Sequence, residues 1–470
     1  MPDTVSQQVA VKAEPQNTSP AKGNNSKLII IGGLIVLVLI MVVGVAAFML
    51  FGAKSTTTAN NQITAGPKVE ANALTIYHWW TSPGEVAAVT ALVNVFSKKY
   101  PDVAIMSSPV TSAGNVDFQK ILQPMVLNGQ APDSFQGHPG YEIIPYYNSK
   151  TIGTVDDLWK SENLESVIPK AIQDINKFKG NYYSVPIDVQ RGNVVWYNKP
   201  LLDKNGINPA TLTTWDAFFA ACDKLRASGV QYPIQMGENW TETHVYENIA
   251  GSVGAQYFED WANGKVTSET DPRTIQAFAI FKKYLSYTNT DYAKLAWNDA
   301  VDRVIKGQSA FNVMGDWANG EFKIVGMKYG KDYGTFPLPG TSNEYIVTVD
   351  TFVRPKGIAH SVNATNWLAV VGSKEGQDAF NVLKGSISAR KDADVSLYDG
   401  YQKSAISDFN SAKYILPSRG TSMPPSFVTG LDGVIAAFVA DKDVNKAAKA
   451  MADLTNKVHN DYIITWSFVK

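Results

Sequence analysis

A run of apolar residues near the N-terminus constrains this chain more than any other feature, because positions 28–53 carry no charged side chain. Residues 28–52 read LIIIGGLIVLVLIMVVGVAAFMLFG. A helix that crosses a bilayer needs roughly 20 apolar residues, so this segment is long enough to span one. We therefore expect one transmembrane helix over 28–52, which acts as a membrane anchor.

A cleaved secretory signal peptide is the main alternative for this run. The apolar region of such a peptide is shorter, about 7–15 residues, and follows a short basic segment. Here residues 1–27 come first and the apolar run is longer, so retention as an anchor is the simpler interpretation. No Cys directly follows the run, which excludes a lipid-modified N-terminus at that point.

The polar segments on either side of the run differ in their basic residues. Three lysines precede the run and two follow it: Lys12, Lys22, Lys27, Lys54 and Lys68. By the positive-inside rule this difference favours a cytoplasmic N-terminus, with the rest of the chain on the extracellular side. We interpret residues 1–27 as a short polar tail and residues 53–72, which are rich in Thr and Asn, as a flexible tether.

The composition indicates a folded chain and excludes two classes of protein. Of the 470 residues, 45% are hydrophobic and 18% are charged, and the net charge is −1. This balance excludes a largely disordered chain and an electrostatic nucleic-acid binder, which would carry a basic surplus. The single cysteine, Cys222, allows neither a disulfide within the chain nor a cysteine-based metal site. The length predicts two or three domains.

After the tether, segments that favour strands alternate with segments that favour helices. Residues 74–80 (LTIYHWW) favour a strand, and the S-P-G-E motif at 82–85 is typical of a capped helix N-terminus. The runs 184–198, 310–314 and 346–353 are also of β-type, with helical spacing between them. The chain is therefore predicted to be an α/β protein with more than one sheet.

The sequence contains none of the short motifs that identify common catalytic or metal sites. G-x-S-x-G, H-E-x-x-H and the glycine-rich phosphate loops are absent, and the five histidines show no metal-ligand spacing. We therefore predict no cofactor, no metal ion and no catalytic residue. A surface-anchored glycoside hydrolase, whose paired carboxylates meet only in the fold, stays open as the alternative.

Tryptophans stand beside polar residues at several predicted strand ends. The triplets are His78-Trp79-Trp80, Asn239-Trp240-Thr241 and Asp316-Trp317-Ala318. A sugar is bound by aromatic rings against its C–H faces and by polar side chains at its hydroxyl groups. This combination of residue types indicates a carbohydrate site, and the competing interpretation is that the tryptophans belong to the core.

Six longer strings are more specific than any of these motifs. They are LTIYHWWTSPGEVAAVTALVNVFSKKYPDV, APDSFQGHPG, YSVPIDVQRGNVVWYNKPLL, GENWTETH, VDRVIKGQSAFNVMGDWANG and VGSKEGQDAFNVLKGSISAR. In this order they resemble the sugar-binding proteins of ABC importers, most closely the glucose/mannose-binding branch. The resemblance extends from residue 74 to the C-terminus and implies an extracytoplasmic receptor that is not an enzyme.

The resemblance also implies a fold, which is a periplasmic-binding-protein-like (type II) domain of two α/β lobes with hinge crossovers. On this basis lobe one comprises 73–187 plus 347–383, and lobe two comprises 188–346 plus 384–470. The sugar lies in the cleft, and the lobes close around it by hinge bending. The implied function is capture of a monosaccharide of the glucose, mannose or galactose type and its delivery to the permease subunits.

Eleven residues match family positions and are candidate sugar contacts. They are Trp79, Trp80, Glu85, Gln136, His138, Trp240, Asp316, Trp317, Asp350, Lys384 and Arg419. Some have an alternative role: one ring of the Trp79-Trp80 pair would be core, and Glu85 and Asp316 would cap helices. Arg419 stands where some glucose-type relatives have His. Its guanidinium group has five N–H donors in a rigid plane, which makes a uronic acid or an epimer of glucose a more plausible ligand.

Two further alternatives and one modification stay open. A sensory ectodomain would need an output domain, and residues 1–27 are too short to provide one. Some archaeal sugar-binding proteins resemble prepilins, in which a cut near Gly23 would leave the apolar segment in place. Sequons for N-glycosylation, which matter only in an exported segment, are present at Asn17, Asn24, Asn239 and Asn363.

Overall fold

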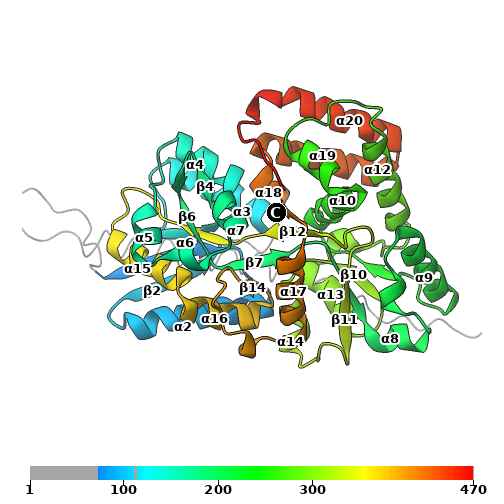
Figure 1. The fold of residues 1–470 in the computed structure, drawn as a ribbon, viewed down its shortest axis with the longest axis horizontal. Helices are drawn as coiled ribbons and strands as arrows, with labels where there is room; N and C mark the ends of the chain where they lie inside the picture. Colours follow the sequence, from blue (N-terminus) through cyan, green and yellow to red (C-terminus); the bar gives the residue numbers. More distant parts are fainter. Residues whose placement is uncertain (1–71, 111–113, 469–470) are drawn as a thin grey trace, which may run out of the picture. The chain divides into compact units, whose positions relative to one another are not determined.

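The computed structural model describes residues 72–110 and 114–468 of the chain (Figure 1). The predicted tail (1–27), transmembrane helix (28–52) and tether (53–72) lie outside these residues, apart from Asn72. Among the helices that the structure does describe, none is both long enough and apolar enough to cross a bilayer.

The first sheet has five strands in the order β2-β1-β3-β13-β6. These strands are β1 (Ala73–His78), β2 (Ala104–Pro109), β3 (Ser134–Gly137), β6 (Ser184–Pro186) and β13 (Thr351–Val353). β1 pairs in parallel with β2 and β3, whereas β13 runs antiparallel to β3 and β6. Leu74 and Ile76 of β1 are buried and alternate with half-buried residues, because successive side chains of a strand point to opposite faces.

Three helices pack together against this sheet: α2 (Pro83–Lys99), α15 (Ser361–Gly372) and α16 (Lys374–Lys384). Figure 1 shows α2 and α16 side by side. α2 begins at the predicted S-P-G-E motif, where Oε2 of Glu85 accepts a hydrogen bond from the backbone N–H of Ser82 at 3.3 Å. Lys98 and Lys99 occupy its last turn, where the helix dipole favours positive charge. The capped helix predicted from the sequence is therefore confirmed.

The second sheet has four strands in the order β11-β8-β10-β9. These strands are β8 (Val194–Asn198), β9 (Ile234–Gln235), β10 (Phe311–Val313) and β11 (Tyr333–Pro337). All of β8 is buried, as expected for a strand that is covered on both faces. The helices that share a hydrophobic core with this sheet include α9 (Trp215–Ala227), α10 (Trp240–Val253), α11 (Ala255–Ala262), α12 (Pro272–Leu285), α19 (Pro425–Asp441) and α20 (Val444–Lys457).

The third sheet lies where the chain passes between these two regions, and its order is β14-β7-β12-β15. Its strands are β7 (Asp188–Arg191), β12 (Glu344–Thr348), β14 (Ile387–Ser388) and β15 (Tyr414–Pro417). The chain leaves the first sheet for the third at Ile187, returns through Asp350, and leaves again after α16. Ile187 donates its N–H to the Asp350 carbonyl and accepts from the Asn381 side chain, both at 2.9 Å, so these passages are bound to one another.

Two β-type runs predicted as single segments are divided between sheets. Residues 184–198 form β6, β7 and β8, which belong to the first, third and second sheets. Residues 346–353 form the end of β12 and the whole of β13, in the third and first sheets. Local propensity predicts extended backbone, but the change of sheet depends on partner strands that are distant in the sequence.

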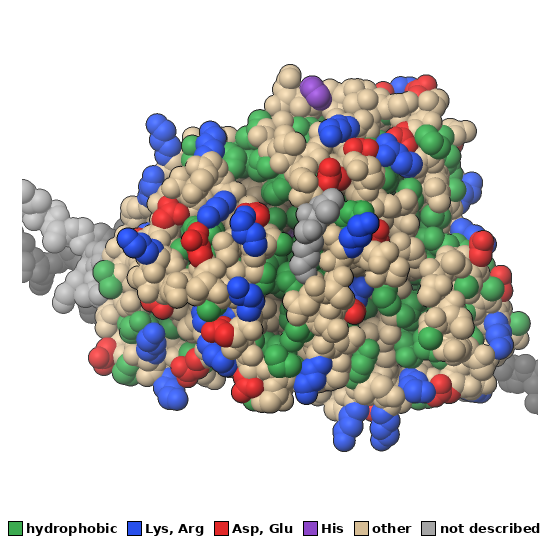
Figure 2. All heavy atoms as spheres, in the orientation of Figure 1, with side chains coloured by type: hydrophobic (Ala, Val, Ile, Leu, Met, Phe, Trp, Pro, Cys, Tyr) green, Lys and Arg blue, Asp and Glu red, His purple; other side chains and the backbone are tan. Residues whose placement is uncertain are grey.

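Further elements lie between these along the chain. They are α3 (Gly114–Leu127), α4 (Ile144–Asn148), α5 (Asp156–Ser161), α6 (Leu164–Val167), α7 (Lys170–Asn176), α8 (Lys199–Lys204), α13 (Trp297–Ile305), α14 (Ala318–Ile324), α17 (Gly400–Ser411), α18 (Arg419–Ser422), the strand pair β4 (Lys177–Phe178) and β5 (Asn181–Tyr182), and the 3₁₀ turn η1 (Gly140–Ile143). On the face shown in Figure 2, basic and acidic side chains are interspersed, in line with the near-zero net charge of the whole chain.

Candidate functional site

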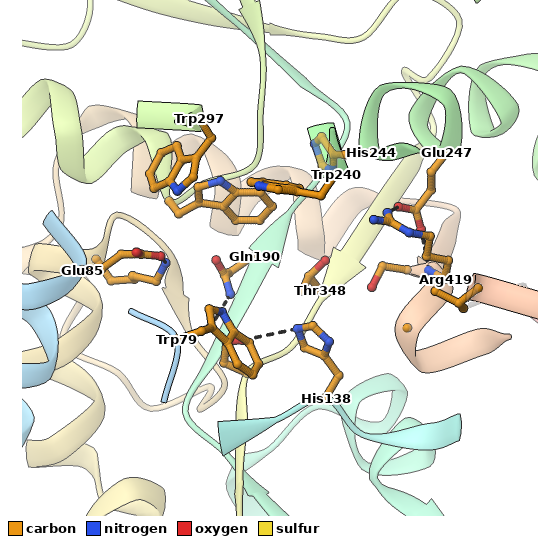
Figure 3. A pocket seen from close by; sticks show the side chains of 16 residues that line it. Trp79, Glu85, His138, Gln190, Trp240, His244, Glu247, Trp297, Thr348 and Arg419 are labelled. Atoms are coloured by element: carbon orange, nitrogen blue, oxygen red, sulfur yellow. Dashed lines mark hydrogen bonds and ion pairs between the residues drawn. The ribbon is translucent and has the colours of Figure 1, made fainter. Parts of the chain in front are cut away.

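A cavity lies where strand ends from the first and third sheets meet α10 and the segment that follows β10 (Figure 3). Its volume is about 140 Å³. One buried water needs only roughly 10–15 Å³, whereas pockets for drug-sized ligands measure roughly 300–1,000 Å³. The cavity therefore has the size of a small-molecule site.

Eight of the eleven predicted contact residues lie in the cavity wall. They are Trp79, Glu85, His138, Trp240, Trp317, Asp350, Lys384 and Arg419. They come from strand ends and helix termini that are far apart in the sequence, so the fold brings together side chains that the sequence presents in separate strings.

Trp80, predicted as a contact, does not line the cavity. Its side chain is fully buried, and its ring centroid lies 4.7 Å from that of Phe380 and 5.8 Å from that of Phe352. Trp79 and Trp80 follow a strand directly, and neighbouring residues of extended chain point to opposite sides. Trp79 therefore faces the cavity while Trp80 belongs to the core between β13 and α16.

Gln136 and Asp316 are also buried behind the wall rather than in it. Oε1 of Gln136 accepts a hydrogen bond from the backbone N–H of Trp79 at 3.1 Å, which holds Trp79 in place. Asp316 accepts a hydrogen bond from the hydroxyl of Tyr401, and its own N–H donates to the Arg191 carbonyl at 3.1 Å. Each side chain thus has one oxygen engaged inside the protein and does not line the cavity, and its contact with a sugar stays a prediction.

The wall also contains residues that the sequence patterns did not predict. They are Gln190, His244, Glu247, Trp297, Thr348, Ser418, Gly420 and Val428. His244 and Glu247 follow Trp240 at i+4 and i+7, a spacing that places all three on one face of α10. That spacing could have been found from the sequence, whereas Trp297, at the start of α13, has no comparable signal.

The first ion pair of the wall joins α2 to the end of α16. Nζ of Lys384 lies 2.9 Å from Oε1 of Glu85, and both side chains are almost fully buried. Burial by itself lowers the pKa of Lys384, but the carboxylates of Glu85, Asp350 and Asp188 outweigh it and raise the pKa overall. Since Oε2 of Glu85 caps α2, this residue has both of the roles considered from the sequence, helix cap and cavity wall.

The second charged group is centred on His138, which follows β3. Its Nδ1 lies 3.0 Å from Oε2 of Glu142 and its Nε2 lies 3.5 Å from Oδ1 of Asp350. Burial favours the neutral ring, but the two carboxylates outweigh burial and raise the pKa of His138 to about 10. Nε2 of Gln190 donates to the other oxygen of Asp350 at 2.8 Å. His138 is therefore a cation at neutral pH. It contacts the carboxylate of Asp350, both oxygens of which have a partner in the wall (Figure 3).

The third pair holds the start of α18. Glu247 accepts from the backbone N–H of Arg419 with one oxygen, and from Nη1 of the same residue, at 2.6 Å, with the other. The Glu247 side chain is 2% exposed and that of Arg419 is 12% exposed. The guanidinium group is thus oriented by a buried carboxylate, and such charge-assisted bonds are stronger than neutral ones.

Aromatic rings also contribute to the surface of the cavity. Trp79 lies on one side, and Trp240 lies on the other, near Trp317 and His244 (Figure 3). The ring centroids of Trp240 and Trp317 are 6.2 Å apart, and those of His244 and Trp317 are 5.5 Å apart. A flat molecule between these two sides can pack both of its faces on indole rings.

The sequence of this chain matches the model of a family described as bacterial extracellular solute-binding protein, over residues 80–378. An uncharacterized ABC transporter extracellular-binding protein of Pyrococcus horikoshii is 41% identical over 390 residues, which cover 82% of this chain and 87% of that protein. A probable sugar-binding periplasmic protein of Brucella suis is 30% identical over 376 residues, which cover 77% of this chain and 86% of that protein.

Two solved structures have the same fold. One is the bacterial solute receptor AcbH, described as having an exclusive preference for β-D-galactopyranose, with a TM-score of 0.73 and 16% identity over 83% of this chain and 100% of that one. The other is a chitin oligosaccharide binding protein, with a TM-score of 0.73 and 18% identity over the same shares. At these identities the likeness identifies the α/β fold of solute receptors.

Proposed function

Since the chain belongs to the family of bacterial extracellular solute-binding proteins, and with its relatives to the sugar-binding receptors of ABC importers, we propose that its ligand is a neutral monosaccharide of the glucose, mannose or galactose type. Members of this family bind solutes outside the cytoplasm and are not enzymes. The chain is accordingly a receptor, and its partners are the permease subunits of an importer. The relatives give no support to the alternative function as a glycoside hydrolase.

The observation that carries this proposal is the pairing of the cations in the cavity wall. Lys384 pairs with Glu85, His138 with Asp350 and Arg419 with Glu247. A neutral polyol can donate to the carboxylates and accept from the cations without disturbing these pairs. Hydrogen bonds between hydroxyl groups and charged partners contribute roughly 1.5–3 kcal/mol each.

The same pairing argues against the uronic acid considered for Arg419. A ligand carboxylate would have to share the guanidinium with Glu247, which already engages both the backbone and the side chain of Arg419. It would also enter a buried site beside three protein carboxylates, and uncompensated negative charge there is costly. We therefore expect a neutral sugar to bind more tightly than the corresponding uronate.

Size and shape support a single sugar ring. The cavity measures about 140 Å³ and has indole rings on two sides. This volume is below the roughly 300–1,000 Å³ of pockets for larger organic ligands. A pyranose between Trp79 and Trp240 would place its C–H faces on the rings and its hydroxyl groups toward the ion pairs.

We further propose that the cavity opens and closes between two lobes, one comprising 73–187 plus 347–383 and the other 188–346 plus 384–470. The first sheet belongs to lobe one and the second sheet to lobe two. The bonded passages at Ile187 and Asp350 are where the chain would bend.

The apolar run 28–52 supports a single-pass anchor, with the tether 53–72 between the membrane and the binding domain. With a cytoplasmic tail, this places the sugar site on the extracellular side of the cell membrane. Such an anchor would keep the receptor close to the permease without contributing to the cavity.

Titration calorimetry tests the proposal directly. The purified chain is titrated with D-glucose, D-mannose, D-galactose, maltose and D-glucuronate. We expect one of the three hexoses to bind most tightly. Tighter binding of maltose would contradict the single-ring ligand, tighter binding of glucuronate would contradict the neutral ligand, and no binding of any sugar would contradict both.

A further inference from the structure

The last described residues, 462–468, form an extended segment that we call the strap. Side chains from the rest of the protein hold the strap through hydrogen bonds to its backbone. Tyr141 of η1 accepts from the N–H of Ile464 at 2.8 Å. Asn263, which follows α11, accepts from the N–H of Trp466 at 2.8 Å and donates to its carbonyl at 3.1 Å. Glu259 accepts from the N–H of Phe468 at 2.9 Å. Figure 1 shows this part of the chain running back from α20 to α18.

The side chain of Trp466 lies at a junction of the hydrophobic interior. It packs on the core of the second sheet and its helices, on the core of the first and third sheets, and on the smaller cluster around Phe118 and Tyr141. The strap therefore joins η1, which follows the first sheet, to α11, which belongs with the second.

The indole of Trp466 also reaches the helix that carries a cavity residue. Its Nε1 donates to the carbonyl of Ser422, the last residue of α18, at 2.8 Å. α18 is a single turn, closed by the bond from the Ser422 N–H to the Ser418 carbonyl at 2.9 Å. Because a single turn moves as a unit, a bond at its end fixes the position of Arg419 at its start.

The opposite side of α18 is fixed by η1. Gly140 has a φ of +74°, and a Cβ atom there would lie 2.2 Å from the Thr421 carbonyl oxygen. Only glycine allows this approach of backbone to backbone. α18 is thus held between η1 on one side and the Trp466 indole on the other.

From these contacts we propose that Trp466 is a positioning residue of the sugar site, which sets the place of Arg419 through α18. It does not line the cavity, and its effect on the ligand passes through Arg419. The proposal rests on the function proposed above, because it concerns the geometry of the same site.

The test uses Trp466→Phe, which retains a large ring and removes the N–H donor. The probe is whichever of D-glucose, D-mannose and D-galactose binds the wild-type chain most tightly. Loss of one hydrogen bond is expected to raise the Kd about 2- to 10-fold. Trp215→Phe is the matched control, since Trp215 is also half-buried and donates its indole N–H once, to Ser252 at 3.0 Å, but packs on the core of the second sheet only. We expect it to change the Kd less than twofold.

A double-mutant cycle with Arg419→Ala separates positioning from general loosening of the fold. If Trp466 acts through Arg419, Trp466→Phe has no further effect on the Kd once Arg419 is removed. An unchanged Kd in Trp466→Phe alone, or an equal loss with and without Arg419, overturns the inference while the proposed function stands. Absence of sugar binding by the wild-type chain overturns the proposed function, and the inference with it.

Discussion

Two histidines face the cavity from different walls, and their surroundings give them opposite charge states. His138 lies between Asp350 and Glu142; burial alone would lower its pKa, but the two carboxylates raise it to about 10. His244 lies on α10 near Trp317, and burial, assisted by the charge of Arg419, lowers its pKa to about 3. At neutral pH the first is a cation and the second is neutral.

These residues represent two regions of the site. The charged wall consists of Glu85, His138, Asp350 and Lys384, and the aromatic wall consists of Trp240, His244 and Trp317. Buried charges cost free energy unless each has a partner, so the charged wall is coupled to folding. Aromatic rings at the edge of a cavity contribute mainly to the affinity for the ligand. We therefore expect changes in the charged wall to affect stability and changes in the aromatic wall to affect affinity.

The largest effect is expected for Lys384→Met. The substitution leaves Glu85 in a buried site without its cation, and removing one partner of a buried pair costs about 3–5 kcal/mol. Urea unfolding followed by circular dichroism measures this loss. In the control, Lys170→Met breaks the exposed pair with Asp174 and is expected to cost less than about 1 kcal/mol. Equal losses in the two variants would mean that the charged wall is not coupled to folding.

The two histidines predict opposite pH dependence of stability. The folded-state pKa of His138 lies above its ordinary value of 6.5, so its stabilisation is complete below pH 6.5 and is lost as the pH rises toward 10. The folded-state pKa of His244 lies below 6.5, so its stabilisation is complete above pH 6.5 and is lost as the pH falls toward 3. At about 1.4 kcal/mol per unit of pKa shift, each change amounts to at most about 5 kcal/mol over its range.

The measurement is the unfolding free energy of wild type, His138→Gln and His244→Gln at pH 5, 7 and 9. The difference between wild type and His138→Gln should shrink from pH 7 to pH 9. The difference between wild type and His244→Gln should shrink from pH 7 to pH 5. If both differences shrink as the pH changes in the same direction, the two histidines do not have opposite effects on the pH dependence of stability.

Trp240→Ala tests the aromatic wall. Loss of a stacking ring is expected to weaken binding of the hexose by about 1–3 kcal/mol, measured by titration calorimetry. Because Trp240 is half-buried, its removal should leave the unfolding free energy within about 1 kcal/mol of wild type. Trp80→Ala is the control for a core tryptophan and should instead cost about 3–5 kcal/mol of stability. Unfolding of the Trp240 variant would show that its ring is part of the core.

The smallest effect is expected at the two described sequons. Asn363 is 9% exposed and its side chain donates to the Ala73 carbonyl at 2.9 Å, so no glycan fits there in the folded chain. Asn239 is exposed at the start of α10 and remains a candidate. Mass spectrometry of peptides from exported protein should find a glycan at Asn239 and none at Asn363. Asn239→Gln should change the sugar Kd less than twofold, and a glycan on Asn363 would contradict the burial.

The sequence predicted much of the fold because its local patterns are strong. The capping motif at 82–85 begins α2, alternation along β1 buries Leu74 and Ile76, and the matched strings identify the family, which the comparisons confirm. The run 184–198 shows the limit of such patterns. It was predicted as one β-type segment, and it supplies one strand to each of three sheets, because each strand finds its partners elsewhere in the chain.

The sequence by itself determined the family, the α/β class and the strings from which the cavity wall is built. Only the tertiary structure decided which member of the Trp79-Trp80 pair faces the cavity and which charges are partnered. Glu85 and Lys384 are 299 positions apart, yet their atoms lie 2.9 Å from each other in a buried site. Local patterns act over a few residues along the backbone. A buried charge, in contrast, is stable only beside an opposite charge, and folding alone brings two such distant residues into contact.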